Sequence, residues 1–316
     1  MTDEVSFITQ ALHNLAGTWN NATLSGLAAL QVPENVLGRR RSLLRADINE
    51  QWAIWFIESL ADPRRYAGND VSYAFLFRDV LTVVDQRFHT FTKPEKKRIA
   101  STVARILQQR VLAFQAKRQR QPVSRSEKIS LIELAGSSPR CWLCGWQFTK
   151  EAIDNFIQQG RREIPLPKFI DFLKPRGLKQ RDLSIEIDHV VAHVHGGENE
   201  GNLRLACGWC NRYKSALTSI YDVEGRPRQV KPNNLGINSL PQPFWIVRLL
   251  ATERVCEHPE GCDCSADDSE MTIAPICNGG ALNPSNLRVT CYSHDNLGSI
   301  RFQPSRVVRQ LWGLSD

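Results

Sequence analysis

The chain has 316 residues, of which 42% are hydrophobic and 23% charged, and its formal net charge is +7. This composition is typical of a globular protein with room for two or three domains. No apolar run reaches the roughly 18–20 residues that a membrane-spanning helix needs. The first residues, Met1-Thr2-Asp3-Glu4, do not resemble a secretory signal. We therefore expect a cytoplasmic protein with no membrane partner.

Residues 1–130 are predicted to form a helical domain. Asp47 precedes a strongly apolar run and is expected to cap a helix that begins there. Tyr73 to Phe88 is a second apolar run of helix length. A third helix is predicted from Pro94, because apolar residues then recur at helical spacing: Ile99, Val103, Leu107, Val111 and Phe114.

Charge is unevenly distributed along the chain. Between Asp85 and Lys128 there are twelve Lys or Arg residues and three Asp or Glu residues. Two interpretations remain open for this basic stretch: a solvated helix with an exposed linker, or a face that follows a phosphate backbone. The stretch Glu257–Glu270 contains six acidic residues and neither Lys nor Arg, which argues against phosphate contact there.

All nine cysteines lie beyond residue 140. In a reducing compartment, clustered cysteines bind metal more often than they form disulfides. Cys141-Trp142-Leu143-Cys144 and Cys207-Gly208-Trp209-Cys210 are two C-x-x-C pairs, which together supply the four thiolates of a structural zinc site. A redox role is the alternative for a single C-x-x-C, but the presence of two pairs favours zinc.

The residues between and after these pairs carry the chemistry. An alternating segment, 183–187, is predicted to be a strand that leads to Asp188-His189. Gly196-Gly197, Asn202-Leu203, the second cysteine pair, Asn211 and Lys214 then follow in order. This arrangement resembles the HNH endonuclease family, whose pattern runs C-x-x-C, D-H, G-G, N-L, C-x-x-C-N and K. The resemblance covers about a quarter of the chain and defines a predicted nuclease domain over residues 131–222.

Phosphodiester hydrolysis requires a base that activates water and a cation that stabilises the developing charge. His189 is a natural base, since the unperturbed pKa of histidine is about 6.5. Asp188 and Asn211 offer oxygen ligands suited to Mg²⁺ or Mn²⁺, and Asn211 directly follows a zinc ligand. The resemblance implies a ββα-metal fold in which Asp188 and Asn211 hold the metal, His189 is the base and Asn202 orients the loop and the base.

The chain departs from the family pattern after the Asp-His pair. The family often has a proline where this chain has Ala192, and His193 and His195 follow. His195 is interpreted as a polar surface residue. Candidate contacts with nucleic acid are Lys214, Arg204 and His193, and an exposed helix face is the alternative interpretation for the two basic residues.

A proline- and glycine-containing segment, 223–250, is predicted to be a linker, and residues 251–316 form a second cysteine-rich unit. Asn286–Cys291 parallels Asn202–Cys207 position by position. We expect a degenerate HNH-like module in which Met271-Thr272 occupies the Asp-His position and catalysis is lost. An unrelated zinc knuckle is the alternative. The predicted ligands of the second zinc are Cys256, Cys262, Cys291 and His294. Cys264 is a possible substitute for Cys262, and Cys277 is not needed.

The sequence therefore predicts an α+β protein with a helical N-terminal domain, a zinc-supported HNH module and a second, smaller zinc module. The expected function is a metal-dependent endonuclease that hydrolyses DNA and makes one nick per active site. A role in restriction or anti-phage defence, with a protein partner, follows from family habit alone. The alternative is a non-catalytic zinc protein that binds nucleic acid or a partner protein, and RNA stays open as the substrate.

Overall fold

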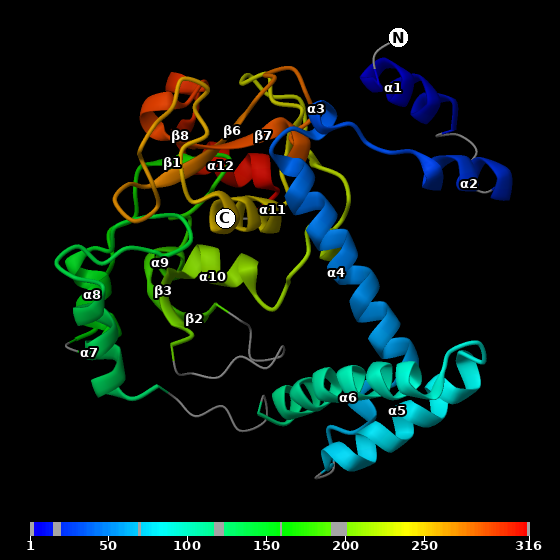
Figure 1. Ribbon diagram of the computed structural model, residues 1–316. Coiled ribbons are helices and arrows are strands. Elements are labelled where there is room, and N and C mark those ends of the chain that lie inside the picture. Colours follow the sequence, from blue (N-terminus) through cyan, green and yellow to red (C-terminus); the bar gives the residue numbers. More distant parts are fainter. Residues whose placement is uncertain are drawn as a thin grey trace. The chain divides into compact units, whose positions relative to one another are not determined.

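The computed structural model describes residues 3–14, 20–68, 71–116, 123–158, 160–190 and 201–314. Helices and two-stranded antiparallel sheets make up this part of the chain (Figure 1), which confirms the predicted α+β class. No helix among the described residues is both long and apolar enough to cross a membrane. The chain divides into two compact units, Met1–Asn49 and Glu50–Asp316.

The first unit is helical. It contains α1 (Asp3–Asn14), α2 (Asn21–Ala29), α3 (Glu34–Leu37) and the first half of α4 (Arg40–Leu60). The Asn20 side chain caps α2 by accepting a hydrogen bond from the backbone of Ala22 at 2.9 Å. The expectation that Asp47 begins a helix is wrong. Asp47 lies inside α4 and is fully buried, because the residues from Arg40 onwards already continue the same helix.

The second unit begins with a helical layer. Ser72 caps α5 (Tyr73–Arg87), which lies beside α6 (Lys93–Ala116) in Figure 1. Both predicted helices are present, and the buried residues on each recur at a spacing of four. On α5 these are Leu76, Val80 and Val84, and on α6 they are Val103, Leu107 and Val111. The short η2 (Pro63–Arg65) precedes α5, and α7 (Arg125–Leu134) begins at a capping box of Ser124 and Glu127.

Two hairpins follow, one in each cysteine-rich unit. Strands β2 (Ile185–His189) and β3 (Leu203–Cys207) pair and lead into α10 (Gly208–Lys214). Strands β6 (Met271–Pro275) and β7 (Leu287–Cys291) pair and lead into η6 (Tyr292–His294). The first strand begins at Ile185 rather than at residue 183, because α9 (Gln180–Leu183) precedes it. The strand ends at His189, so Asp188 and His189 are its last two residues.

The end of the chain packs on the segment inserted between the first cysteine pair and β2. That insertion contains α8 (Lys150–Phe156) and β1 (Phe169–Asp171). Strand β8 (Phe302–Pro304) pairs with β1, and α12 (Ser305–Trp312) follows it. The indole of Trp312 donates to the carbonyl of Phe172 at 2.7 Å. The residues that follow the second hairpin are therefore joined to the insertion that precedes the first hairpin by strand pairing and a hydrogen bond. The remaining short turns are η4 (Ile220–Asp222), η5 (Pro284–Asn286) and η7 (Gly298–Ile300).

The segment predicted as a linker, 223–250, contains two short strands and most of a helix. These are β4 (Arg228–Gln229), β5 (Ser239–Leu240) and α11 (Pro243–Glu253). Residues 243–250 are part of the core and not a linker, because seven of these eight residues are apolar and buried. The prolines of the segment favour a linker, whereas the apolar run that follows them forms the helix.

Candidate active site and metal centres

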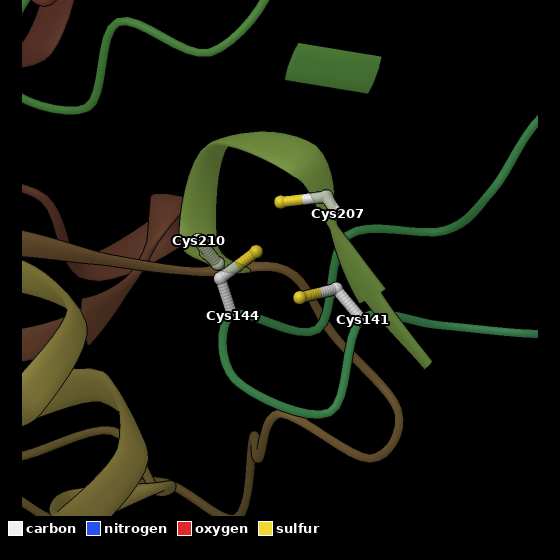
Figure 2. Close-up of side chains that lie close together, drawn as sticks. All are labelled: Cys141, Cys144, Cys207 and Cys210. Atoms are coloured by element: carbon white, nitrogen blue, oxygen red, sulfur yellow. The ribbon is translucent and has the colours of Figure 1, made fainter. Parts of the chain in front are cut away.

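The four cysteines of the two C-x-x-C pairs converge on one point. Their sulfur atoms lie within 4.8 Å of one another and all four residues are buried. Figure 2 shows Cys141 and Cys144 on one loop, and Cys207 and Cys210 at the end of β3 and on α10, with their sulfurs turned toward one another. This arrangement fits a closed tetrahedral zinc site. Burial raises the pKa values of Cys207 and Cys210 well above the ordinary value, so a bound cation is needed to keep these sulfurs as thiolates.

Two buried cations stand beside this cluster. Nη1 of Arg176 donates to the sulfur of Cys144 at 3.3 Å, and Nζ of Lys174 contacts Glu270 at 2.7 Å. A zinc ion with four thiolate ligands has a net charge of −2, which is costly to bury without positive partners. Arg176 and Lys174 supply that charge, and Glu270 bonds to both cations.

The second cluster consists of Cys256, Cys262, Cys291 and His294, whose ligand atoms also lie within 4.8 Å of one another. The fold therefore brings together the four ligands that the sequence predicts. Cys264 lies outside this group; its backbone nitrogen donates to the sulfur of Cys262 at 3.5 Å, an arrangement typical of a knuckle around a ligand. Cys277 is exposed and also lies outside the cluster. Both zinc-sized clusters among the described residues thus correspond to the two cysteine-rich units.

The first hairpin fixes the backbone of the Asp-His pair. Asp188 lies opposite Arg204 and His189 lies opposite Leu203 in the antiparallel register. The next backbone nitrogen, that of Val190, donates to the carbonyl of Asn202 at 3.0 Å. Asn202 is thereby adjacent to the strand end that carries His189, and its role in orienting the loop and the base stays a prediction. Asp188 and His189 point to opposite faces of the strand, since side chains alternate along it.

The Asp188 carboxylate is held from two sides. Nε1 of Trp142 donates to Oδ2 at 2.9 Å, and Nζ of Lys214 donates to Oδ1 at 3.0 Å. Asp188 is only 4% exposed. Burial raises its pKa above the ordinary value, although Lys214 and Trp142 both act to lower it. A buried carboxylate with a shifted pKa and a specific charge partner is a candidate functional group.

Asn211 occupies the first turn of α10, directly after the zinc ligand Cys210. Its amide nitrogen donates to Oε2 of Glu186 at 2.7 Å. The amide oxygen is therefore the end of Asn211 that a cation would bind. Glu186 lies on the same face of β2 as Asp188, two residues away. Asp188, Asn211 and Glu186 form a set of oxygen donors whose chemistry fits Mg²⁺ or Mn²⁺.

The three candidate contacts with nucleic acid have different surroundings. Lys214 does not lie on an exposed helix face, because its ammonium also donates to the carbonyl of His189 at 2.6 Å and its side chain is 13% exposed. Arg204 is exposed, and its guanidinium donates to the carbonyls of Gly201 and Leu203. His193 lies outside the described residues. For all three, contact with phosphate stays a prediction.

Sequence reasoning missed two residues next to the candidate metal site. Glu186 had a usable signal, because strand alternation places it on the face of Asp188. Trp142 had none: nothing in the spacing of a C-x-x-C pair indicates that the residue between the cysteines reaches the carboxylate 46 positions later.

The second hairpin repeats the backbone hydrogen bonds of the first. The nitrogen of Glu257 donates to Val289 at 2.9 Å, as that of Trp142 donates to Leu205 at 2.9 Å. Likewise, the nitrogen of Ile276 donates to the carbonyl of Asn286 at 2.9 Å, as Val190 does to Asn202.

This register corrects one prediction. Met271 pairs with Cys291 as Ile185 pairs with Cys207, so the positions of Asp188 and His189 are taken by Ala274 and Pro275. The prediction that Met271-Thr272 occupies them is wrong by three residues. The spacing between motifs does not fix the position of a strand residue, whereas the pairing with the second strand does. The conclusion that neither replacement can hold a metal or accept a proton is unchanged.

A hairpin with Asp-His at its strand end, joined to a helix through a four-cysteine cluster, defines the class of zinc-supported HNH nuclease domains. Residues 177–217 match the family model described as HNH endonuclease, so the chain contains an HNH endonuclease domain. The matched segment includes β2, β3 and α10, and with them Asp188, His189 and Asn211. No curated protein and no solved structure matches the chain.

Proposed function

We propose that this protein is a metal-dependent endonuclease that hydrolyses phosphodiester bonds in DNA at the first hairpin. The observation that carries the proposal is that Asp188 and His189 on β2, and Asn211 directly after the cluster residue Cys210, all lie within the segment that matches the HNH family model. Restriction or anti-phage defence, with a protein partner, stays a prediction that the gene neighbourhood tests.

In this proposal, His189 accepts a proton from the attacking water, and Asp188 and Asn211 hold Mg²⁺ or Mn²⁺. When bound, the cation stabilises negative charge on the phosphate and on the leaving oxygen. Asn202 keeps the strand end and the following loop in place. Its counterpart in the second hairpin, Asn286, supports this role, because its side chain bonds to Cys277 and Ala281 across the loop.

Lys214 has a double role in the proposal. Its ammonium contacts Asp188 and the carbonyl of His189, so it neutralises the buried carboxylate when no divalent ion is present. Because the same ammonium also contacts the carbonyl of His189, Lys214 is in addition the candidate phosphate contact at this strand end.

His189→Ala tests the proposed function. We expect the rate of nicking of supercoiled plasmid, with Mg²⁺ or Mn²⁺, to fall by about 10²–10⁴-fold, the usual contribution of a general base. His89→Ala is the matched control, since His89 is exposed and lies in the turn between α5 and α6. An equal zinc content in both variants shows that the fold is retained. Unchanged nicking by His189→Ala contradicts the proposal.

The second candidate function is that of a zinc protein that binds nucleic acid or a partner protein without cutting. The ion pair of Asp188 with Lys214 favours it, because this pair satisfies the carboxylate without any divalent ion. Wild-type protein that binds DNA but cuts neither DNA nor RNA with any divalent metal supports this alternative. Cleavage of RNA but not DNA would keep the chemistry and change the substrate.

A further inference from the structure

The second zinc module contacts the first cysteine knuckle directly. The backbone nitrogen of Met271 donates to the carbonyl of Cys144 at 2.8 Å. At Gly145, where φ is +71°, an added Cβ would lie 1.9 Å from the carbonyl oxygen of Ser269. The knuckle loop is therefore packed against the second module with no space for a side chain at Gly145. Because the contact is this close, a displacement of one module must displace the other.

Arg254 forms the most specific of these contacts. It follows α11 in a left-handed conformation, with φ of 30°, and lies two residues before the zinc-cluster residue Cys256. Its guanidinium donates to the carbonyl of Trp142 and to the carboxylate of Asp267. The backbone nitrogen of Ala266 donates to the carbonyl of Arg254 at 2.8 Å. A non-glycine residue is held in this conformation only where surrounding contacts enforce it.

Trp142 continues this line of contacts to the candidate active site. Its backbone nitrogen donates to the carbonyl of Leu205 on β3 at 2.9 Å. Its indole nitrogen donates to Oδ2 of Asp188 at 2.9 Å, and its ring lies 5.9 Å from Nζ of Lys214. Backbone and side chain of one residue thus connect Arg254, the hairpin and the metal-binding carboxylate.

We propose that Arg254 and Trp142 are positioning residues through which the second zinc module orients the Asp188 carboxylate for the catalytic metal. This inference rests on the proposed function, because it assumes that Asp188 binds the catalytic ion. The hydrogen bond from Trp142 occupies Oδ2 of Asp188 and restricts rotation of the carboxylate. Oδ1 is thereby directed toward the side on which Lys214 lies. The inactive second module is thereby retained as a support for the active one.

Hydrogen-bond partners of metal ligands have measurable effects on metal affinity. Loss of such a partner weakens metal binding or activity by about 10–100-fold. Trp142→Phe removes the indole donor and keeps an aromatic ring in place. We expect zinc-loaded Trp142→Phe to bind Mn²⁺ about tenfold more weakly than wild type in a titration followed by electron paramagnetic resonance. Nicking at saturating Mn²⁺ should recover most of the wild-type rate.

Trp146→Phe is the matched control. Trp146 belongs to the same knuckle loop, but its ring packs against Phe148 and Arg176 and not against Asp188. Its Mn²⁺ affinity should equal that of wild type. Equal Mn²⁺ affinities of Trp142→Phe and Trp146→Phe would overturn the proposal.

The role of the second module is tested by two further variants. Arg254→Met removes the guanidinium, and Cys291→Ser removes a ligand of the second cluster; both changes lie in the second module and not at Asp188. Both should lower Mn²⁺ affinity several-fold, whereas Cys277→Ser, which changes an exposed cysteine outside the cluster, should not. Wild-type affinity in Arg254→Met with a retained first zinc contradicts the proposal.

Asp188→Ala separates this inference from the proposed function. If Asp188→Ala abolishes Mn²⁺ binding and Trp142→Phe leaves it unchanged, the positioning role fails and the metal assignment stands. If Asp188→Ala binds Mn²⁺ as tightly as wild type, both the metal assignment and the positioning role are wrong. Weak binding in Trp142→Phe and none in Asp188→Ala supports both.

Discussion

The two hairpins share a backbone and differ on one face. On the first, Glu186 and Asp188 lie on one face of β2, and Asn211 of α10 donates to Glu186. On the second, the corresponding positions hold Thr272, Ala274 and Asp295, because Asp295 follows His294 as Asn211 follows Cys210. Both acidic residues of the first face are therefore replaced in the second hairpin, and Asp295 takes the position of the amide Asn211.

Arg301 fills the second face. It is fully buried, and its guanidinium donates to both oxygens of Asp171 at 2.9 Å and to Asp295 at 2.6 Å through Nε. It also donates to Thr272 and to the carbonyl of Ile273. A fixed guanidinium thus takes the place that a divalent cation is proposed to take in the first hairpin. The two hairpins therefore differ in the residues of one face, and this difference is the reason that we propose an exchangeable metal for the first hairpin alone.

Zinc content tests whether both hairpins are built on metal, and its loss should have the largest effect. Wild-type protein should contain two zinc ions, one for each cluster. Cys207→Ser and Cys291→Ser should each lose one ion, and Cys207→Ser should lose the fold of the nuclease domain. Structural zinc contributes about 10–16 kcal/mol of binding free energy in small zinc modules. A single zinc ion in wild-type protein, measured by mass spectrometry, would show that the two hairpins are not equivalent metal scaffolds.

Arg301→Leu tests the guanidinium that replaces a metal. The substitution leaves Asp171 and Asp295 buried without their cation, and loss of one partner of a buried ion pair costs about 3–5 kcal/mol. We expect a loss of this size in the free energy of unfolding, measured with urea, while the zinc content remains unchanged. Arg306→Leu changes an exposed arginine on α12 and should have an effect within about 0.5 kcal/mol. Equal stability of the two variants would show that the second face is not held by Arg301.

Glu270 forms ion pairs with Lys174 and Arg176. We expect its contribution to the free energy of unfolding to depend on pH and to be of intermediate size. Burial alone would raise its pKa, but Arg176 and Lys174 outweigh burial and hold the pKa below its ordinary value. The carboxylate therefore stabilises the fold fully above the unfolded-state pKa of about 4.3. This contribution is lost as the pH falls through the lower folded-state pKa.

Glu270→Gln removes that charge and keeps a similar shape. At pH 7 we expect a destabilisation of about 2–3 kcal/mol, the usual range for a hydrogen bond to a charged group. The difference between wild type and variant in urea unfolding should shrink as the pH is lowered below about 4.3. A difference that stays constant from about pH 7 to about pH 3.5 would show that Glu270 contributes no charge-dependent contact between the modules.

The sequence was sufficient for the parts of the site that depend on local spacing. The two clusters, the strand with Asp188 and His189, and the position of Asn211 after a zinc ligand all follow from short motifs. The hydrogen bond from Trp142 to Asp188 and the burial of Arg301 between Asp171 and Asp295 do not, because they join residues 46 and as many as 130 positions apart. Pairing also decided which residues replace the Asp-His pair, since register is set by the strands and not by the gaps between motifs.

We propose that only the first of the two hairpins cuts a phosphodiester bond. The most direct test of this claim is the product of supercoiled plasmid treated with dilute, zinc-loaded protein and Mg²⁺. One active site per chain predicts that nicked circles accumulate first and that linear molecules appear only later. Linear plasmid formed from the start without a nicked intermediate, by protein that is monomeric at that concentration, would contradict this claim.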